Sequence, residues 1–224
     1  NQEILYSQFS KINLSAAAGY KLNEHQQLEA SVIVDDARDI GYPALPMDVS
    51  IAKAVIASIG YTRHHLSKTW QEWETKMYHN KVTHLMDDTK RPVVPIRMDM
   101  PGWSTTTGMY SRIDGKSSRH QFKLTASAHH NRSLAEMTMY PNDPAEKQMF
   151  MLTWPDVHTW YAGLFVEDNF QFHRQWTLSS STGVAFQQHQ LKDESGVKSL
   201  QIYDPDMQSV KNRFLKNFGS NLQY

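Results

Sequence analysis

Alternation between apolar residues and polar or small residues is the feature that most narrows the folds open to this chain. From Ile12 to Leu22 an apolar side chain occupies every second position, and the positions between hold lysine, asparagine, serine, alanine and glycine. A period of two is the period of a β-strand, because successive side chains point to opposite faces of a sheet. The run therefore predicts a strand with one apolar and one polar face.

The same alternation returns at seven further places along the chain. We expect these strands at residues 28–34, 51–61, 70–79, 103–113, 121–129, 160–166 and 176–187, with a further short strand near the end of the chain. No window carries a sustained helical stripe of apolar residues with capping residues at its ends. The sequence thus predicts an all-β fold of eight or nine strands that follow one another up and down.

The connections predicted between these strands alternate in length. Long polar stretches at 35–48, 80–101, 131–155 and 192–207 are separated by short turns. A transmembrane β-barrel has short turns at one end and long loops at the other, and its strands span the bilayer with about 9–11 tilted residues. A soluble sandwich has no reason to separate its loops by length, so the order of connections favours the barrel.

Aromatic residues gather where such strands would end. Near the short turns lie Tyr20, Tyr61, Trp70, Trp73, Phe170, Phe172 and Trp176, and near the long connections lie Trp103, Trp154 and Trp160. Aromatic girdles mark both interfaces of membrane barrels, because an amphipathic ring suits the headgroup region. The small residues Ala16, Ala18, Ser180 and Thr182 on the expected lipid face keep the average hydropathy low, which is unusual for a membrane surface.

Composition excludes several functions. The chain has 224 residues, and its 23 lysine and arginine residues balance 23 aspartate and glutamate residues. A nucleic-acid-binding protein would show a basic excess. Cysteine is absent, which rules out disulfides, thiolate metal sites and thiol catalysis. No nucleophile elbow, phosphate-binding loop, dinucleotide fingerprint or zinc-protease motif appears, so we expect no enzyme activity and no resident cofactor.

Short sequence motifs at the strand edges resemble those of a known family. The motifs are 42–48 (YPALPMD), 84–88 (HLMDD) with 89–92 (TKRP), and 98–101 (MDMP) leading into 105–110 (TTTGMY). This series resembles the barrel of TonB-dependent outer-membrane receptors, in particular a branch of copper receptors and related bacterial metal-uptake proteins. The resemblance covers roughly residues 10–190. It implies a location in the bacterial outer membrane, gated import of a metal, siderophore or haem, and energy from the TonB system through a plug domain.

The resemblance also implies a larger barrel than this chain supplies. The family has 22 strands, which at about 25 residues for each strand and connection need roughly 550 residues. We therefore expect residues 1–224 to be a barrel segment with the plug outside it. Two alternatives remain open at this point: a complete eight-stranded outer-membrane barrel with a structural or adhesive role, and a soluble ligand-binding β-barrel or sandwich.

Two groups of residues are candidates for substrate contact. Histidine and methionine suit soft transition metals such as copper(I), and both are abundant near the long connections. His84 and Met86 lie two positions apart, as do Met98 and Met100, and residues i and i+2 of a strand share a face. The pairs therefore predict one mixed nitrogen and thioether site. The carboxylates of Asp35, Asp36, Asp87 and Asp88 are expected in loops, where they would suit a harder ion or plain solvation.

Overall fold

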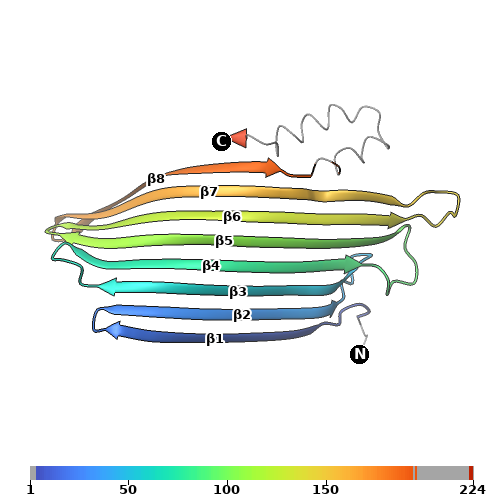
Figure 1. The fold of residues 1–224 in the computed structure, drawn as a ribbon, viewed down its shortest axis with the longest axis horizontal. Coiled ribbons are helices and arrows are strands. Elements are labelled where there is room, and N and C mark those ends of the chain that lie inside the picture. Colours follow the sequence, from blue (N-terminus) through green and yellow to red (C-terminus); the bar gives the residue numbers. More distant parts are fainter. Residues whose placement is uncertain (1–3, 194, 196–221, 224) are drawn as a thin grey trace.

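The computed structural model describes residues 4–193, 195 and 222–223, and nearly all of them belong to one antiparallel sheet (Figure 1). Its strands are β1 (Ser10–Asn23), β2 (Gln26–Ile40), β3 (Asp48–His64), β4 (Trp70–Asp87), β5 (Arg97–Ser117), β6 (His120–Tyr140), β7 (Met149–His173), β8 (Trp176–Leu191) and β9 (Leu222–Gln223). No helix in the described part of the chain is long and apolar enough to cross a membrane. The predicted all-β class is confirmed.

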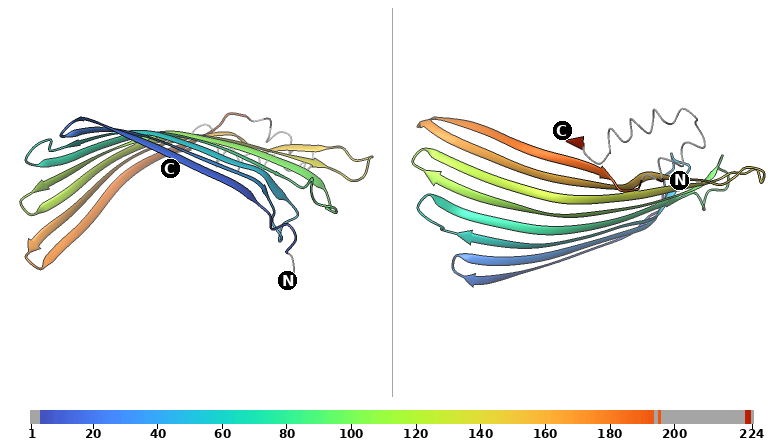
Figure 2. Two further views of the ribbon diagram at one scale, coloured as in Figure 1. Left: turned by 90° about the horizontal axis from the view of Figure 1, so that it is seen from below. Right: turned by 45° about the horizontal axis from the view of Figure 1, so that its top comes forward.

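The strands pair in the order in which they follow along the chain, from β1 to β9. Every neighbouring pair is antiparallel. The sheet is curved, as Figure 2 shows, and within the described residues β1 pairs only with β2. The sheet is therefore an open, curved up-and-down array, and its eight long strands do not close on themselves as the eight-stranded alternative requires.

The strands are longer than their alternation predicted. Most residues of the expected long connections belong to extended strands. The connections that remain are residues 41–47, 88–96 and 141–148. The sequence signal ended early because the alternation of apolar and polar residues becomes irregular there, while backbone pairing continues across the same hairpins. The separation of long from short connections still holds, since the turns at the other end are residues 24–25, 65–69, 118–119 and 174–175. The expected loop at 192–207 lies almost wholly outside the described residues.

Register divides the side chains into two faces. The outer face is defined by the row Ala18, Ala30, Ile59, Met77, Met109, Ala128, Ala162 and Phe186, in which each residue lies opposite the next. The inner face is defined by the adjacent row Gly19, Glu29, Gly60, Lys76, Tyr110, Ser127, Gly163 and Ala185. The expected division is confirmed: Leu124, Ala126, Ala128, Leu164, Val166 and Val184 share the outer face, and Lys123, Thr125 and Gln187 share the inner face.

The inner face is the more crowded one. On β4 the outer residues Met77 and Lys81 are exposed, whereas the inner residues Lys76, Tyr78 and Asn80 are half-buried. Side chains on the concave side of a curved sheet converge, so we assign the inner face to the concave side. The polar set therefore points into the space that the sheet partly encloses.

The apolar band on the outer face crosses the sheet obliquely. In β1 the band runs from Ile12 to Leu22, and in β8 it ends at Phe186 on the side of the long connections. Phe186 is in register with Ala18, which lies in the middle of the β1 band. An apolar belt of constant height around a barrel crosses its strands obliquely, because the strands of a barrel tilt by about 35–45° from the barrel axis.

Aromatic rings mark both edges of this band. On the short-turn side Trp70 packs edge-on against Phe122 with ring centroids 5.1 Å apart, and Tyr61 packs against Trp73 at 5.6 Å. On the other side Trp160 lies on the outer face and its ring is 4.1 Å from that of His130. Aromatic rings from the expected set thus lie at both edges of the band, whereas Trp154 lies opposite the inner-face residue Ala135.

A small core between the connections 41–47 and 88–96 is built on a buried ion pair. Arg91 and Asp48 are 6% and 5% exposed, and their side chains are joined by Nη2–Oδ1 and Nε–Oδ2 contacts of 2.5 and 3.1 Å. Arg91 also donates to the carbonyl oxygens of Tyr42 and Met47 and lies 3.8 Å from the ring of Tyr6. This pair fixes two connections to each other at the rim of the sheet.

We expect Arg91→Ala to lower the free energy of unfolding of the intact protein by about 3–5 kcal/mol, because Asp48 would remain buried without its partner. Denaturant titration in detergent measures this loss. The control is Lys90→Ala at the next position, whose ammonium pairs with Asp39 in the open and should matter by less than about 1 kcal/mol. Equal losses in the two variants would show that Arg91 does not anchor the connections.

Candidate metal-binding site

His84 lies on the inner face of β4 between two small neighbours. Ala52 of β3 and Gly102 of β5 are the residues directly opposite it. The histidine borders a hollow of about 350 Å³ lined largely by apolar side chains, among them Ala37 and Val82. Within the described residues the His84 ring has no hydrogen-bond partner, and the residue is exposed. Its nitrogens are thus open to a ligand from the concave side.

Met86 and the predicted second pair lie on the same face as His84, farther toward the long connections. Met86 lies directly opposite Met100. Met98 is two residues from Met100 on the same strand and therefore shares its face. The structure brings the four predicted residues onto the inner face at the end of the long connections, with His84 and Met86 on β4 and the other two on β5.

The methionine row continues across two further strands. Met98 lies opposite Met139, Met139 lies opposite Met149, and Met137 lies opposite Met151. We call the set the methionine ladder: Met86, Met98, Met100, Met137, Met139, Met149 and Met151, all of them half-buried. The i, i+2 spacing of Met137 with Met139 and of Met149 with Met151 is visible in the sequence. Their pairing was not foreseen, because residues 131–155 were expected to form a loop.

This arrangement concentrates one kind of donor. Thioether sulfur is a soft, uncharged ligand that selects copper(I), and imidazole nitrogen binds the same ion. Directly opposite residues of an antiparallel pair have Cβ atoms about 4.5–5.5 Å apart, so facing methionine side chains can reach a common ion. Among the described residues no group of three or more histidine, aspartate and glutamate side chains is placed to hold a metal.

The four predicted carboxylates do not come together. Asp35 and Asp36 belong to strand β2 rather than to a loop, because pairing with β1 and β3 continues past them. As neighbours in a strand they point to opposite faces. Asp35 pairs with Lys11 at 2.8 Å and Asp36 with Arg38 at 2.8 Å.

Asp87 and Asp88 are also engaged by their own surroundings. Partial burial opposes ionisation of Asp87, but hydrogen bonds from the Thr89 hydroxyl and N–H, at 2.6 and 3.0 Å, outweigh it and lower the pKa of this carboxyl. Asp88 is 4% exposed and accepts a hydrogen bond from the backbone N–H of Met98 at 2.9 Å, with Arg97 3.5 Å away. Both carboxylates therefore hold the β4–β5 connection in place.

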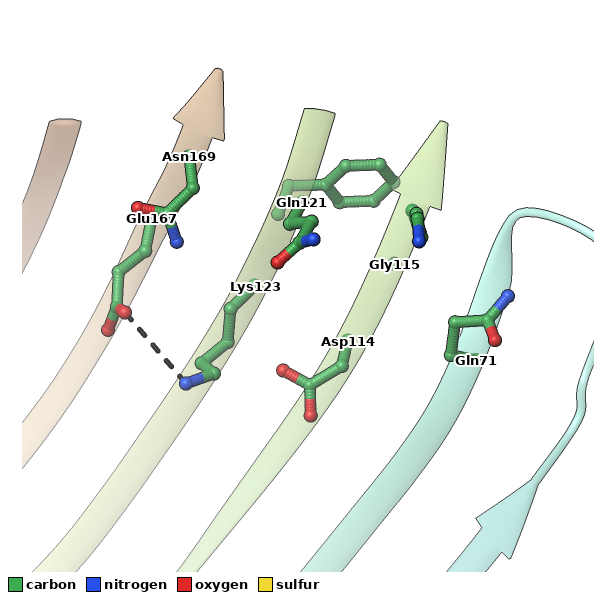
Figure 3. A pocket seen from close by; sticks show the side chains of 9 residues that line it. Gln71, Asp114, Gly115, Gln121, Lys123, Glu167 and Asn169 are labelled. Carbon is green, nitrogen blue, oxygen red and sulfur yellow. Dashed lines mark ion pairs between the residues drawn. The ribbon is translucent and has the colours of Figure 1, made fainter. Parts of the chain in front are cut away.

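A second hollow on the inner face lies near the short turns and has different chemistry. It has a volume of about 410 Å³ and is bordered by the charged residues Asp114, Lys116, Lys123 and Glu167 together with amide side chains. Figure 3 shows Asp114, Lys123 and Glu167 around this hollow. Lys123 and Glu167 form an ion pair of 3.9 Å. Its lining contains neither histidine nor methionine. The end of the inner face toward the long connections thus carries the histidine and methionine donors, with the Lys11–Asp35 ion pair bordering the hollow beside His84. The end toward the short turns carries mixed charges without these donors in its hollow.

Comparison with known proteins places the fold and leaves the family open. No protein-family model matches the chain, and no curated protein matches it in sequence. Among 31 solved chains of similar fold is one titled "Copper transporter OprC", with a TM-score of 0.74 and 17% sequence identity over 84% of this chain. The chain spans 31% of the length of that protein. At this identity the likeness concerns the fold, so the sheet resembles part of that transporter.

Proposed function

We propose that this chain forms part of the wall of an outer-membrane transporter that imports copper(I) or a copper chelate. The observation that carries the proposal is the juxtaposition of His84 with the methionine ladder on the concave face. Soft donors in a row suit a soft ion, and they line the side of the sheet that would face the lumen of a barrel. The fold likeness to a solved copper transporter supports the same assignment.

The proposal assigns each part of the sheet a role. The outer apolar band contacts the bilayer, the long connections lie on the extracellular side, and the inner face receives the substrate. Transport consists of binding and gated passage without a covalent step. Energy would come from the TonB system through a plug domain, as the resemblance of the strand-edge motifs implies. Passage of an iron siderophore or haem is the second candidate, because those substrates are also bound by loops and inner faces.

The proposal is tested by metal uptake in cells. We expect deletion of the gene to lower copper accumulation several-fold under copper limitation, and expression of the intact protein from a plasmid to restore it. Iron accumulation and growth on siderophore or haem serve as parallel measurements. A deletion strain with normal copper accumulation but impaired iron or haem uptake would replace copper by the second candidate.

A further inference from the structure

We propose that the outer face binds the phosphate groups of membrane lipids through basic side chains just beyond the apolar band, on the side of the long connections. The inference rests on the proposed membrane location. It concerns a surface that faces away from the metal site and that needs none of the histidine and methionine donors.

The basic residues lie in one cross-strand row. Lys81 of β4 is opposite Thr105, Thr105 is opposite Arg132, and Arg132 is opposite His158 of β7. With strands about 4.8 Å apart, this row spans roughly 15 Å. Lys53 of β3 extends it, since Lys53 lies opposite Thr83, two residues along β4 from Lys81.

The row borders the part of the surface that would contact acyl chains. Two residues closer to the short turns lies the row His79, Thr107, His130 and Trp160, and next to that lies the apolar row from Met77 to Phe186. Imidazole and indole rings suit the headgroup region, where one side of the ring is apolar and the other wet. The basic side chains therefore lie at the level where lipid phosphates would be found.

The charge on this surface has a net positive sign. Next to the band the outer face carries the basic residues Arg38, Lys53, Lys81 and Arg132 and the acidic residues Asp36 and Asp156. Asp36 pairs with Arg38, and Asp156 binds Arg132 through contacts of 2.5 and 3.2 Å.

The two lysines supply the excess. Neither Lys53 nor Lys81 forms an ion pair within the described part of the chain. A basic group at a membrane surface attracts anionic lipid, and the adjacent apolar band would hold the acyl chains of the same molecule. A phosphate linked to a lipid thus matches this surface better than a free anion does, because a free anion has no acyl chains to pack against the apolar band.

The test measures lipid binding by the intact protein in detergent with native mass spectrometry. The probes are bisphosphorylated lipid A and the same lipid with its phosphates removed. Wild-type protein should bind the phosphorylated form at least tenfold more tightly, and 10 mM inorganic phosphate should not displace it. Equal affinity for the two lipids, or displacement by free phosphate, would overturn the inference.

Variants locate the site. Lys53→Gln with Lys81→Gln should weaken binding of the phosphorylated lipid roughly tenfold or more, since each surface cation contributes to attraction. The matched control is Lys21→Gln with Lys76→Gln, two inner-face lysines, and should leave binding unchanged. Equal effects of the two double variants would remove the site from the outer face. Failure of the wild-type protein to enter bilayers at all would instead contradict the membrane location.

Discussion

Replacing His84 and Met86 together by alanine should weaken copper(I) binding by the intact protein at least roughly a hundredfold. Loss of groups that only support metal ligands already costs about 10–100-fold in affinity, and this double variant removes two direct donors. The remaining ladder methionines would still bind, but without the imidazole and without the partner of Met100. Competition with a copper(I) chelator of known affinity under reducing conditions measures the change.

A matched control separates the site from a general need for methionine. Met77 and Met109 form another directly opposed pair, but on the outer face. Replacing both by alanine should leave the copper(I) affinity within about twofold of the wild-type value. If the two double variants bind copper(I) equally well, His84 and Met86 are not ligands, and the hollow beside His84 is a packing feature.

Ala126→Arg should destabilise the folded protein by about 2–4 kcal/mol in bilayers, the cost of an arginine near the middle of the lipid face of a barrel. Ala126 is exposed, lies near the middle of the apolar band on β6, and is opposite Ser111 and Leu164. On a protein surrounded by water the same exposed substitution would change stability by no more than about 0.5 kcal/mol. The size of the stability loss therefore distinguishes an outer face surrounded by lipid from one surrounded by water.

Its control is Ser127→Arg at the next position, which points to the inner face opposite Tyr110 and Gly163. An arginine there can extend into the polar interior, so the loss should stay below about 1 kcal/mol. Urea titration of protein refolded into lipid vesicles compares the two variants. A loss that is small for Ala126→Arg, or larger for Ser127→Arg, would reverse the assignment of the faces.

Local alternation was sufficient to predict the strands and their faces. The run from Ile12 to Leu22 and the run around Phe122 and Ala128 both lie in strands with the predicted orientation. The pattern reflects a requirement that acts on every residue, since each outward side chain must match its surroundings. For the same reason the alternation ended where the strands pass beyond the apolar band. The ends of β5, β6 and β7 next to the long connections were therefore predicted as loops.

The candidate site was predicted only as far as single strands reach. Residues i and i+2 share a face by covalent geometry, which placed His84 with Met86. The pairing of methionines across neighbouring strands depends on the register of each hairpin. The register in turn depends on the position of each turn in the sequence. The pairing of Met137 with Met151 and the burial of Arg91 with Asp48 bring together residues distant in sequence, and no local pattern marks either one.

Accessibility of spin labels on the two faces tests the central claim most directly, namely that the outer face of this sheet contacts lipid and the inner face contacts water. Single labels at Ala126, Leu164 and Val184 represent the outer face, and labels at Thr125 and Gln187 represent the inner face. In the intact protein reconstituted into bilayers, the first set should be relaxed by molecular oxygen and protected from a water-soluble nickel chelate. The second set should show the opposite preference. Equal accessibility of both sets to the nickel chelate would contradict the membrane assignment and, with it, the proposed transport function.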